Sequence, residues 1–365
     1  MTEARVLLER HKPRLVYDSH EAYFADSAAI WTDSPANVLR RADGTVLAKP
    51  PKLRLSYLGP HVYADGTKIL ATDAIGETTR DYAAHAAALH RNPAYKDRIY
   101  GHARRDGQGR LWLQYWLFYY YNDFQLAGPV LSGGKHEGDW ELVQFRLGPS
   151  EQPEQAVLSQ HRTAESRPWS NVRKATNAPA TPLVYVARGS HANYFAPGAH
   201  WTGVWFDQAD GKGPRIAPTL EVLGDSEPAW VLWPGVWGDT KSTGSPLDSA
   251  SPIGPGRRPH WLDPSKLAVA SPKVGPAPPA PPVPPRATVQ RTSERVVLAY
   301  EASPDATALV VALRRKGSDQ PAVTKAIPID RRSGTLELPA GDRDYDVWAS
   351  VVGPDGAASE GVKAP

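Results

Sequence analysis

Residues 111–147 read LWLQYWLFYYYNDFQLAGPVLSGGKHEGDWELVQFRL. The first part, residues 111–121, is apolar at nearly every position, which is typical of a central strand that is covered on both faces. The last part, residues 141–147, is expected to form a second strand. The sequence therefore predicts two strands inside a sheet, joined by a glycine-containing segment and the polar motif HEGDWE.

Strands are also expected in most of the first 265 residues, for example over 183–187. Residues 77–91 (ETTRDYAAHAAALHR) are rich in alanine and end before Asn92 and Pro93, which predicts a helix. The polar region 149–182 contains prolines and is expected to be a long loop. This pattern predicts an all-β fold, namely a jelly-roll-type β-sandwich with peripheral helices.

A proline-rich stretch divides the chain, because residues 272–285 contain eight prolines and favour an extended spacer. We therefore expect a first domain over 1–268, a linker over 269–286 and a second domain over 287–365. Short strands separated by turn residues predict a small β-sandwich at the C-terminal end. The segment YDVWASVVGPDGAASEG (345–361) resembles the last hairpin of a fibronectin type III domain.

The composition excludes several classes of protein. The chain has 365 residues with 42 Lys and Arg against 39 Asp and Glu, and no run of like charges marks a nucleic-acid-binding surface. It contains no cysteine, so disulfides, thiolate zinc sites and cysteine nucleophiles are excluded. No apolar run is long enough to span a membrane, and no signal peptide is visible. Secreted and cytoplasmic locations are both compatible with the sequence.

The HEGDWE motif supplies a candidate metal site. In an extended strand, Asp139 and Glu141 point to the same face, where two carboxylates repel unless a cation or donors lie between them. His136 enters this strand, and Asp123 ends the preceding one. Carboxylate oxygens with one imidazole suit a hard divalent cation, Ca²⁺ or Mg²⁺ rather than Zn²⁺. The alternative is structural: Asp139 bonds to backbone amides, Glu141 pairs with an arginine, and His136 is solvated.

A second candidate cluster follows the strand predicted over 183–187. Small, amide and aromatic residues at the end of a strand are typical of the edge of a site, although a packed turn is an equal alternative. Several tryptophans form either core or a platform for a sugar or lipid headgroup. The candidate ligand-binding residues are Asn122, Ser190, His191, Asn193, Tyr194 and Trp201.

Several motifs occur together in one order: HEGDWE, then GSHANYF (189–195), then WPGVWGD and SPIGPGRRPHWLDP. Through this combination of motifs the chain resembles the vacuolar protein sorting-associated protein 62 family, and the resemblance covers about Leu15 to Pro264. It is more distantly similar to the necrosis- and ethylene-inducing-like proteins, whose hallmark is the heptapeptide GHRHDWE. Those proteins are β-sandwiches that hold a divalent cation and bind sphingolipid headgroups.

That second resemblance implies roles for particular residues. It matches His136 to the first histidine of the heptapeptide and Asp123 to an upstream aspartate. It departs at Glu137 and Gly138, which replace an arginine and a histidine. The departures concern headgroup specificity, whereas the cation ligands are kept. The residues that match the DWE of the heptapeptide are Asp139, Trp140 and Glu141.

Two functions from different classes follow. The first is a cation-dependent binding protein for a glycan or lipid headgroup, at a cell surface or membrane. The second is a metal-dependent hydrolase of an ester, phosphoester or glycoside, in which Glu141 or His191 acts as general base. A purely structural role for the cluster is the third possibility.

Overall fold

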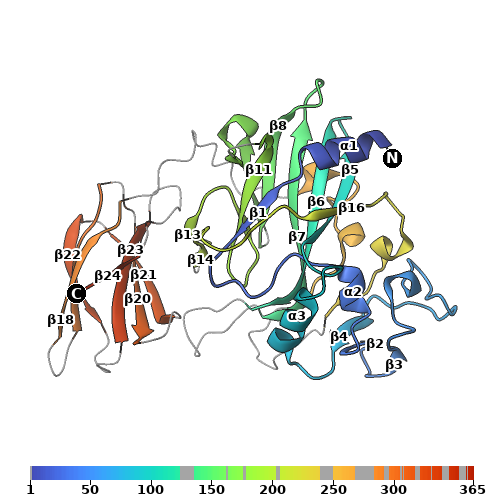
Figure 1. Ribbon diagram of the computed structural model, residues 1–365, viewed down its shortest axis with the longest axis horizontal. Coiled ribbons are helices and arrows are strands. Elements are labelled where there is room, and N and C mark those ends of the chain that lie inside the picture. Colours follow the sequence, from blue (N-terminus) through green and yellow to red (C-terminus); the bar gives the residue numbers. More distant parts are fainter. Residues whose placement is uncertain are drawn as a thin grey trace.

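A computed structural model describes residues 2–123, 135–161, 163–175, 178–202, 206–238, 250–267, 283–291, 296–304, 306, 308–316, 321–329, 331–338, 345–352, 359 and 361–365. Within these ranges the strands form six sheets, and the helices are short and peripheral (Figure 1). The predicted all-β sandwich is confirmed. No helix among the described residues has the length and apolar character needed to cross a membrane.

The largest sheet has six strands in the order β16-β5-β6-β7-β8-β9. All neighbouring pairs from β5 to β9 are antiparallel, and β16 is parallel to β5. The strands are β16 (Thr219–Val222), β5 (Arg98–Arg105), β6 (Leu111–Asn122), β7 (His136–Leu147), β8 (Pro153–Gln160) and β9 (Thr163–Pro168).

Strand β6 is buried on both faces, as its sequence predicts, because a separate apolar cluster covers each side of the sheet. Trp116 and Phe118 belong to one cluster, and Tyr115 and Leu117 to the other. Side chains alternate along a strand, so a strand that is apolar at successive positions can be accommodated only between two layers. The sheet is therefore the middle layer of the domain.

The layer on the Tyr115 side is a five-stranded sheet, ordered β10-β11-β1-β15 with β12 beside β11. Leu15 and Tyr17 from β1 pack with Val184 and Val186 from β11 against the central sheet. The strands of this layer are β1 (Arg14–Tyr17), β10 (Lys174–Ala175), β11 (Ala178–Val186), β12 (Asn193–Tyr194) and β15 (Arg215–Ile216). The hairpin of β13 (Gly198–Trp201) and β14 (Phe206–Ala209) follows β12, and helix α1 (Thr2–Arg10) precedes β1.

The layer on the Trp116 side is a four-stranded sheet, ordered β17-β4-β2-β3, with short helical segments around it. Its strands are β2 (Asn37–Arg40), β3 (Val46–Ala48), β4 (Ala74–Glu77) and β17 (Val236–Trp237). Seven buried tryptophans fill the space between this layer and the central sheet: Trp31, Trp116, Trp140, Trp230, Trp233, Trp237 and Trp261. For these seven, the expectation that most tryptophans form core is confirmed. The helical segments around this layer are α2 (Ala28–Thr32), α3 (Tyr82–His90), η1 (Leu55–Tyr57), η3 (Ala229–Leu232), η4 (Pro255–Arg257) and η5 (Pro264–Lys266). Segment η2 (Trp169–Asn171) lies on the Tyr115 side instead, where Trp169 packs against Phe145.

Two expectations about local structure were wrong. The helix begins at Tyr82 rather than at residue 77, because Glu77 ends β4 and Arg80 has a φ of 61°, which a helix cannot contain. Region 149–182 is not a long loop, since it contains β8, β9, β10 and the start of β11. These strands have polar residues on one face because they lie toward the sheet edge, so their pattern resembles that of a loop.

The C-terminal strands form two further sheets, β18-β19-β22 and β21-β20-β23-β24, around their own apolar cluster. Val310, on the outer side of β20, is buried against Ala199 of β13. The fibronectin type III resemblance and the boundaries at 268 and 286 stay predictions, and residues 268–282 of the linker lie outside the described ranges. The strands are β18 (Arg286–Arg291), β19 (Val296–Glu301), β20 (Ala308–Arg315), β21 (Pro321–Pro328), β22 (Ser333–Leu338), β23 (Tyr345–Val352) and β24 (Val362–Lys363).

An ion pair fixes the C-terminal end of α3 to the domain. His90 Nδ1 lies 2.9 Å from the buried carboxylate of Asp26, which also accepts a hydrogen bond from the backbone N–H of Asp97. Burial raises the pKa of Asp26 from 3.8 to about 6, although the hydrogen bond from His90 opposes this. The same bond raises the pKa of His90 above 6.5. The folded chain therefore binds protons at both groups more tightly than the unfolded chain does.

This pair predicts that stability falls as the pH rises from about 4 to about 7, by roughly 1–2 kcal/mol. The sign follows because both pKa values are raised, so folding takes up protons in this window. Urea unfolding at several pH values should show the slope in the wild type and a flatter profile in Asp26→Asn. His61→Gln, at an exposed histidine, is the control and should keep the wild-type slope. An unchanged slope in Asp26→Asn would contradict the assignment.

Candidate functional site around the HEGDWE strand

The candidate site begins where β6 ends and β7 starts. His136 is paired with Asn122 across the two strands, and both residues are buried. Just outside the pair, Lys135 Nζ lies 2.7 Å from Asp123 Oδ1, and both of these side chains are partly exposed. Asp123 therefore lies just after β6, close to His136, the first residue of β7. The connecting residues 124–134 lie outside the described ranges.

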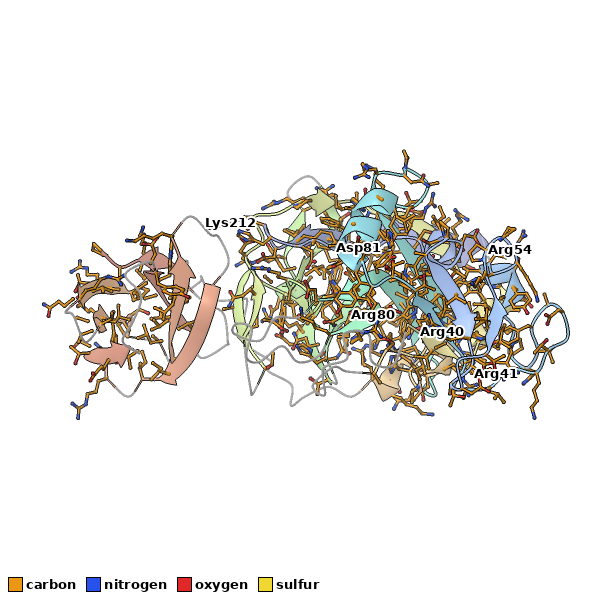
Figure 2. The ribbon with its side chains drawn as sticks, turned by 90° about the horizontal axis from the view of Figure 1, so that it is seen from below. Arg40, Arg41, Arg54, Arg80, Asp81 and Lys212 are labelled. Atoms are coloured by element: carbon orange, nitrogen blue, oxygen red, sulfur yellow. The ribbon has the colours of Figure 1, made fainter. Side chains whose placement is uncertain are left out.

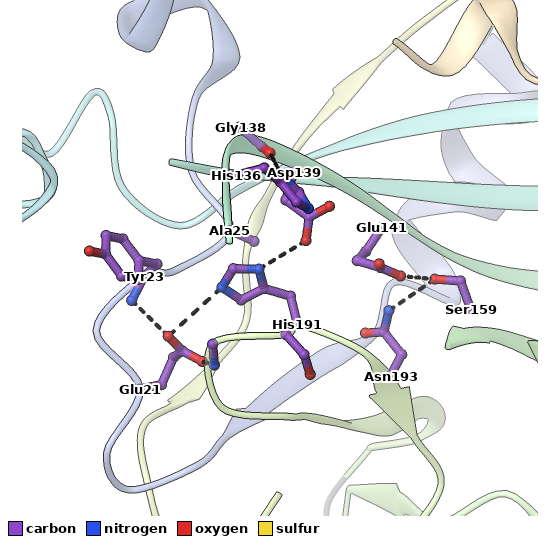
Figure 3. A network of polar contacts seen from close by, with 12 residues as sticks. Glu21, Tyr23, Ala25, His136, Gly138, Asp139, Glu141, Ser159, His191 and Asn193 are labelled. Carbon is purple, nitrogen blue, oxygen red and sulfur yellow. Dashed lines mark hydrogen bonds and ion pairs between the residues drawn. The ribbon is translucent and has the colours of Figure 1, made fainter. Parts of the chain in front are cut away.

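A buried chain of three side chains runs inward from Asp139 (Figure 3). Its Oδ2 lies 3.0 Å from His191 Nδ1, and His191 Nε2 lies 3.8 Å from Glu21 Oε1. The imidazole stacks on Tyr119, with 3.9 Å between the ring centroids and 1° between the planes. Burial alone would raise the pKa of Asp139, but the hydrogen bond with His191 and the positive fields of His136 and His191 hold it below 3.8.

Glu21 is fixed by backbone donors on both carboxylate oxygens. Its Oε1 accepts from the N–H groups of Ala22 and Tyr23, at 2.8 and 2.9 Å, and its Oε2 accepts from Gly189 N–H at 2.7 Å. Gly189 lies in the turn that carries His191, and His191 has a φ of 56°, which non-glycine residues seldom adopt. Glu21 therefore both orients the turn and faces the imidazole. Burial still raises the pKa of Glu21 above 4.5.

Replacing Glu21 with glutamine is expected to destabilise the chain by about 2–3 kcal/mol. Glutamine has one acceptor oxygen, so its NH₂ group would face a backbone N–H, and the charge opposite His191 would be lost. Guanidinium unfolding should show this loss. Glu9→Gln, on the exposed surface of α1, is the control with the same chemical change and should cost less than about 0.5 kcal/mol. Equal costs in the two variants would contradict the role of Glu21.

Glu141 lies two residues further along β7 and contacts β8. Ser159 Oγ donates to Glu141 Oε2, and Asn193 Nδ2 donates to Ser159 Oγ at 3.3 Å. Asn193 Oδ1 is buried and has no hydrogen-bond partner among the described residues. Burial, followed by the negative charge of Asp139, raises the pKa of Glu141 to about 8. The neighbouring groups of Glu141 therefore do not stabilise its negative charge enough to offset the cost of burying it.

The first half of the motif turns toward the other layer. The Glu137 carboxylate accepts from the backbone N–H of Glu77 in β4, at 3.2 and 3.3 Å. Gly138 makes this possible with a φ of +57°, and it packs so closely on the backbone carbonyl of Trp237 that a Cβ atom would overlap it. Glu137 thus contacts the layer that contains β4, whereas Asp139 contacts His191 on the opposite side of the central sheet. The motif therefore connects the central sheet to both outer layers.

A second acidic centre lies next to Glu141. The fully buried Asp207 accepts a hydrogen bond from Ser190 Oγ at 3.0 Å and another from the Tyr194 hydroxyl. It also lies 2.7 Å from His161 Nε2. Burial would lower the pKa of His161, but the charge of Asp207 outweighs this and raises it. Ser190 and His191 therefore bond to different carboxylates, Asp207 and Asp139.

The predicted metal ligands His136, Asp139, Glu141 and Asp123 do not converge closely. Among the described residues, ligand atoms of three such side chains lie within 4.8 Å of one another only at Asp18, His20 and Asp210. That group could hold a metal ion. Its carboxylates are already occupied in part, because Asp18 accepts from His20 N–H and Asp210 N–H, each at 2.9 Å.

Ser190, His191, Asn193 and Tyr194 follow one another along the chain and contact the buried acidic groups, Asn193 through Ser159. Asn122 lies across from His136 at the end of β6. The side chain of Trp201 lies outside the described ranges. The buried residues are Asn122, Ser190, His191, Asn193 and Tyr194.

Sequence reasoning missed Glu21, Ser159, His161 and Asp207. Glu21 and Ser159 lie far in sequence from the residues that they contact, and no spacing or motif marks them. Asp207 lies in a short strand, β14, and His161 in the turn between β8 and β9. The one signal was the GSHANYF segment, whose turn carries Gly189 and Ser190 to these partners.

Comparison with known proteins gives limited similarity. No protein-family model matches the chain. Vacuolar protein sorting-associated protein 62 of Saccharomyces cerevisiae is 28% identical over an alignment that covers 36% of this chain and 36% of that protein. The chain therefore matches about a third of the length of this curated relative.

Among solved structures, the chain is similar to NLPPya in complex with glucosamine, with 13% identity and a TM-score of 0.29 over 60% of this chain and 73% of that one. A structure described as a toxin fold for microbial attack and plant defense has the same identity and the same TM-score, over 60% of this chain and 72% of that one. NLPPya in complex with mannosamine is 14% identical, with a TM-score of 0.26, over 60% of this chain and 73% of that one.

Proposed function

We propose that this chain is a divalent-cation-dependent binding protein that engages a glycan or lipid headgroup at the end of β6 and β7. The observation that carries the proposal is the placement of Asp139 and Glu141 on one buried face of β7. Two carboxylates so placed repel, and the pKa of Glu141, raised to about 8, reflects that repulsion together with burial. A bound cation would stabilise both in their ionised form.

The donor set suits a hard cation. Asp139, Glu141 and the unpartnered Oδ1 of Asn193 supply oxygen atoms, which Ca²⁺ and Mg²⁺ prefer. His136 Nδ1 lies 2.7 Å from the carbonyl oxygen of Gly138, and a proton on Nδ1 would leave Nε2 as the ligand atom. Asp123 lies apart from this set, at the outer edge, where it pairs with Lys135. Once bound, the cation would coordinate hydroxyl or phosphate oxygens of a ligand.

The alternative, a hydrolase, is less compatible with the contacts. His191 is fully buried. Its Nδ1 bonds to Asp139, and its Nε2 faces Glu21 at 3.8 Å without a hydrogen-bond partner among the described residues, so neither nitrogen is exposed to a substrate-bound water. Glu141 is buried and bonded to Ser159. Both residues are better placed to hold the site than to act as a general base.

The ligand class rests on the chemistry of the site and on the resemblance of the motifs. The name of the yeast relative, vacuolar protein sorting-associated protein 62, is compatible with a membrane-associated role. Seven of the tryptophans in the described ranges are core, so a ligand would be recognised through the cation and the polar edge at Asp123 and Lys135 rather than by an aromatic platform.

Metal analysis and thermal-shift titration with Ca²⁺, Mg²⁺, Mn²⁺, Zn²⁺ and EDTA test the proposal. We expect one cation per chain, a melting temperature that rises with Ca²⁺ or Mg²⁺, and loss of both effects in Asp139→Asn and Glu141→Gln. Asp210→Asn is the matched control, because it alters the other candidate group and should leave the shift unchanged. Loss in Asp210→Asn alone would move the cation to that group, and no shift in the wild type would refute the proposal.

A further inference from the structure

A separate part of the surface carries a local excess of positive charge. Residues 40–70, here called the basic lobe, comprise β3, the end of β2 and the turns that follow. The basic lobe contains six Lys or Arg and two Asp, whereas the whole chain has 42 against 39. The remainder of the chain therefore has one more acidic than basic residue, and the net positive charge of the protein is concentrated here.

The two carboxylates of the basic lobe are already used within it. Asp65 lies 2.8 Å from Lys52 Nζ, and Asp43 accepts from the backbone N–H of Thr45. The exposed side chains of Lys49, Arg54 and Lys68 have no carboxylate within 4.0 Å among the residues that the structure describes. Arg54 donates from Nε and Nη2 to the carbonyl oxygen of Pro51, at 3.1 and 2.8 Å, which positions the guanidinium without neutralising its charge. The positive charges of these three side chains can therefore still attract an anionic partner.

The two turns of the basic lobe lie side by side. Arg41 joins them, since its Nη2 donates to the carbonyl oxygen of Lys68 at 3.0 Å and its Nη1 lies 3.2 Å from the buried Asp73. Val62 pairs with Lys68 across the second turn, and Val46 pairs with Arg40 across the first. Figure 2 shows Arg40, Arg41 and Arg54 toward the end of the molecule that is opposite the C-terminal sheets.

Exposed aliphatic side chains accompany these cations. Val46 is 50% exposed, Val62 is 51% exposed and Leu70 is 41% exposed. They are three of the seven large apolar residues that are exposed in the described part of the chain. A single exposed valine needs no explanation. Three of them among unpaired cations form the combination that favours the boundary between lipid headgroups and acyl chains.

We propose that the basic lobe docks on an anionic membrane surface. Lys49, Arg54 and Lys68 would be attracted to the negative surface potential, and Val46, Val62 and Leu70 would enter the headgroup region. A nucleic acid offers no apolar layer for the three aliphatic side chains, so a lipid surface fits better. The basic lobe shares no residue with the cation site, so this docking does not depend on the proposed function.

Co-sedimentation with vesicles tests the docking. The full chain should bind phosphatidylcholine vesicles with about 30% phosphatidylserine and not phosphatidylcholine alone. The triple variant Lys49→Gln, Arg54→Gln, Lys68→Gln should bind about 100-fold more weakly, at about fivefold per charge. The control triple Arg5→Gln, Arg105→Gln, Arg215→Gln removes the same charge from exposed residues elsewhere and should change binding by less than about threefold.

Two further arms identify the partner and separate this docking from the cation site. Val46→Ser with Val62→Ser should weaken vesicle binding about fivefold or more and leave binding to heparin unchanged. Wild-type binding should persist in EDTA, because it needs no cation. Equal loss in both triple variants, equal binding to neutral vesicles, or no effect of the valine substitutions would each overturn the proposal.

Discussion

Replacing Gly138 with alanine is expected to lower the free energy of unfolding by about 3–5 kcal/mol. Gly138 has a φ of +57°, where a Cβ atom costs free energy by itself. In addition, the new Cβ would overlap the backbone carbonyl oxygen of Trp237 in β17. A backbone atom inside a sheet cannot rotate away as a side chain can, so β7 or β17 would have to move and disturb the tryptophan core.

Gly44→Ala is the matched control for this change. Gly44 also has a positive φ, +89°, but nothing lies within 4 Å of its added Cβ, so only the backbone term of about 1–2 kcal/mol applies. Guanidinium unfolding of both variants separates the two terms. Equal destabilisation would contradict the packing argument and leave only the backbone conformation as the reason for glycine in the motif.

Replacing His191 with alanine is expected to cost about 3–5 kcal/mol, the second large effect. The imidazole lies between the buried carboxylates of Asp139 and Glu21 and stacks on Tyr119. Its removal leaves two buried carboxylates without their shared partner and opens a cavity beside the tyrosine ring. Both losses destabilise the turn that carries the neighbouring residues of the site.

The pH dependence distinguishes the charge effect from the cavity. Without His191, the protonated forms of Asp139 and Glu21 are favoured in the folded chain, so their pKa values rise above the unfolded values. The variant should therefore regain stability as the pH falls from about 7 to about 5, because folding then takes up protons. Ser190→Ala, which removes one hydrogen bond to Asp207, should cost about 1 kcal/mol without this pH dependence. A pH-independent loss in His191→Ala would indicate a cavity effect alone.

These two residues show how much of the site was predictable. The identity of the motif, the shared face of Asp139 and Glu141 and the closeness of the GSHANYF turn to a strand end all follow from local pattern. The pairing of His191 with Asp139 and Glu21 does not, because it joins positions that are far apart in the sequence and depends on the packing of two layers. The same holds for Glu77, which the alanine-rich run that follows it assigned to a helix and which instead ends a strand.

Local sequence pattern is enough to establish the fold class and the central strand, because apolar residues at successive positions of a short segment can be buried only between two layers. It also determined which segment combines carboxylates with a histidine. The packing of the layers is what requires Gly138 to lack a side chain and what places Glu21 opposite His191. It also decided that Glu137 turns toward β4 while Asp139 turns away. The physical reason is that periodicity acts over a few residues, whereas buried polar groups find their partners wherever the packing of the sheets brings them together.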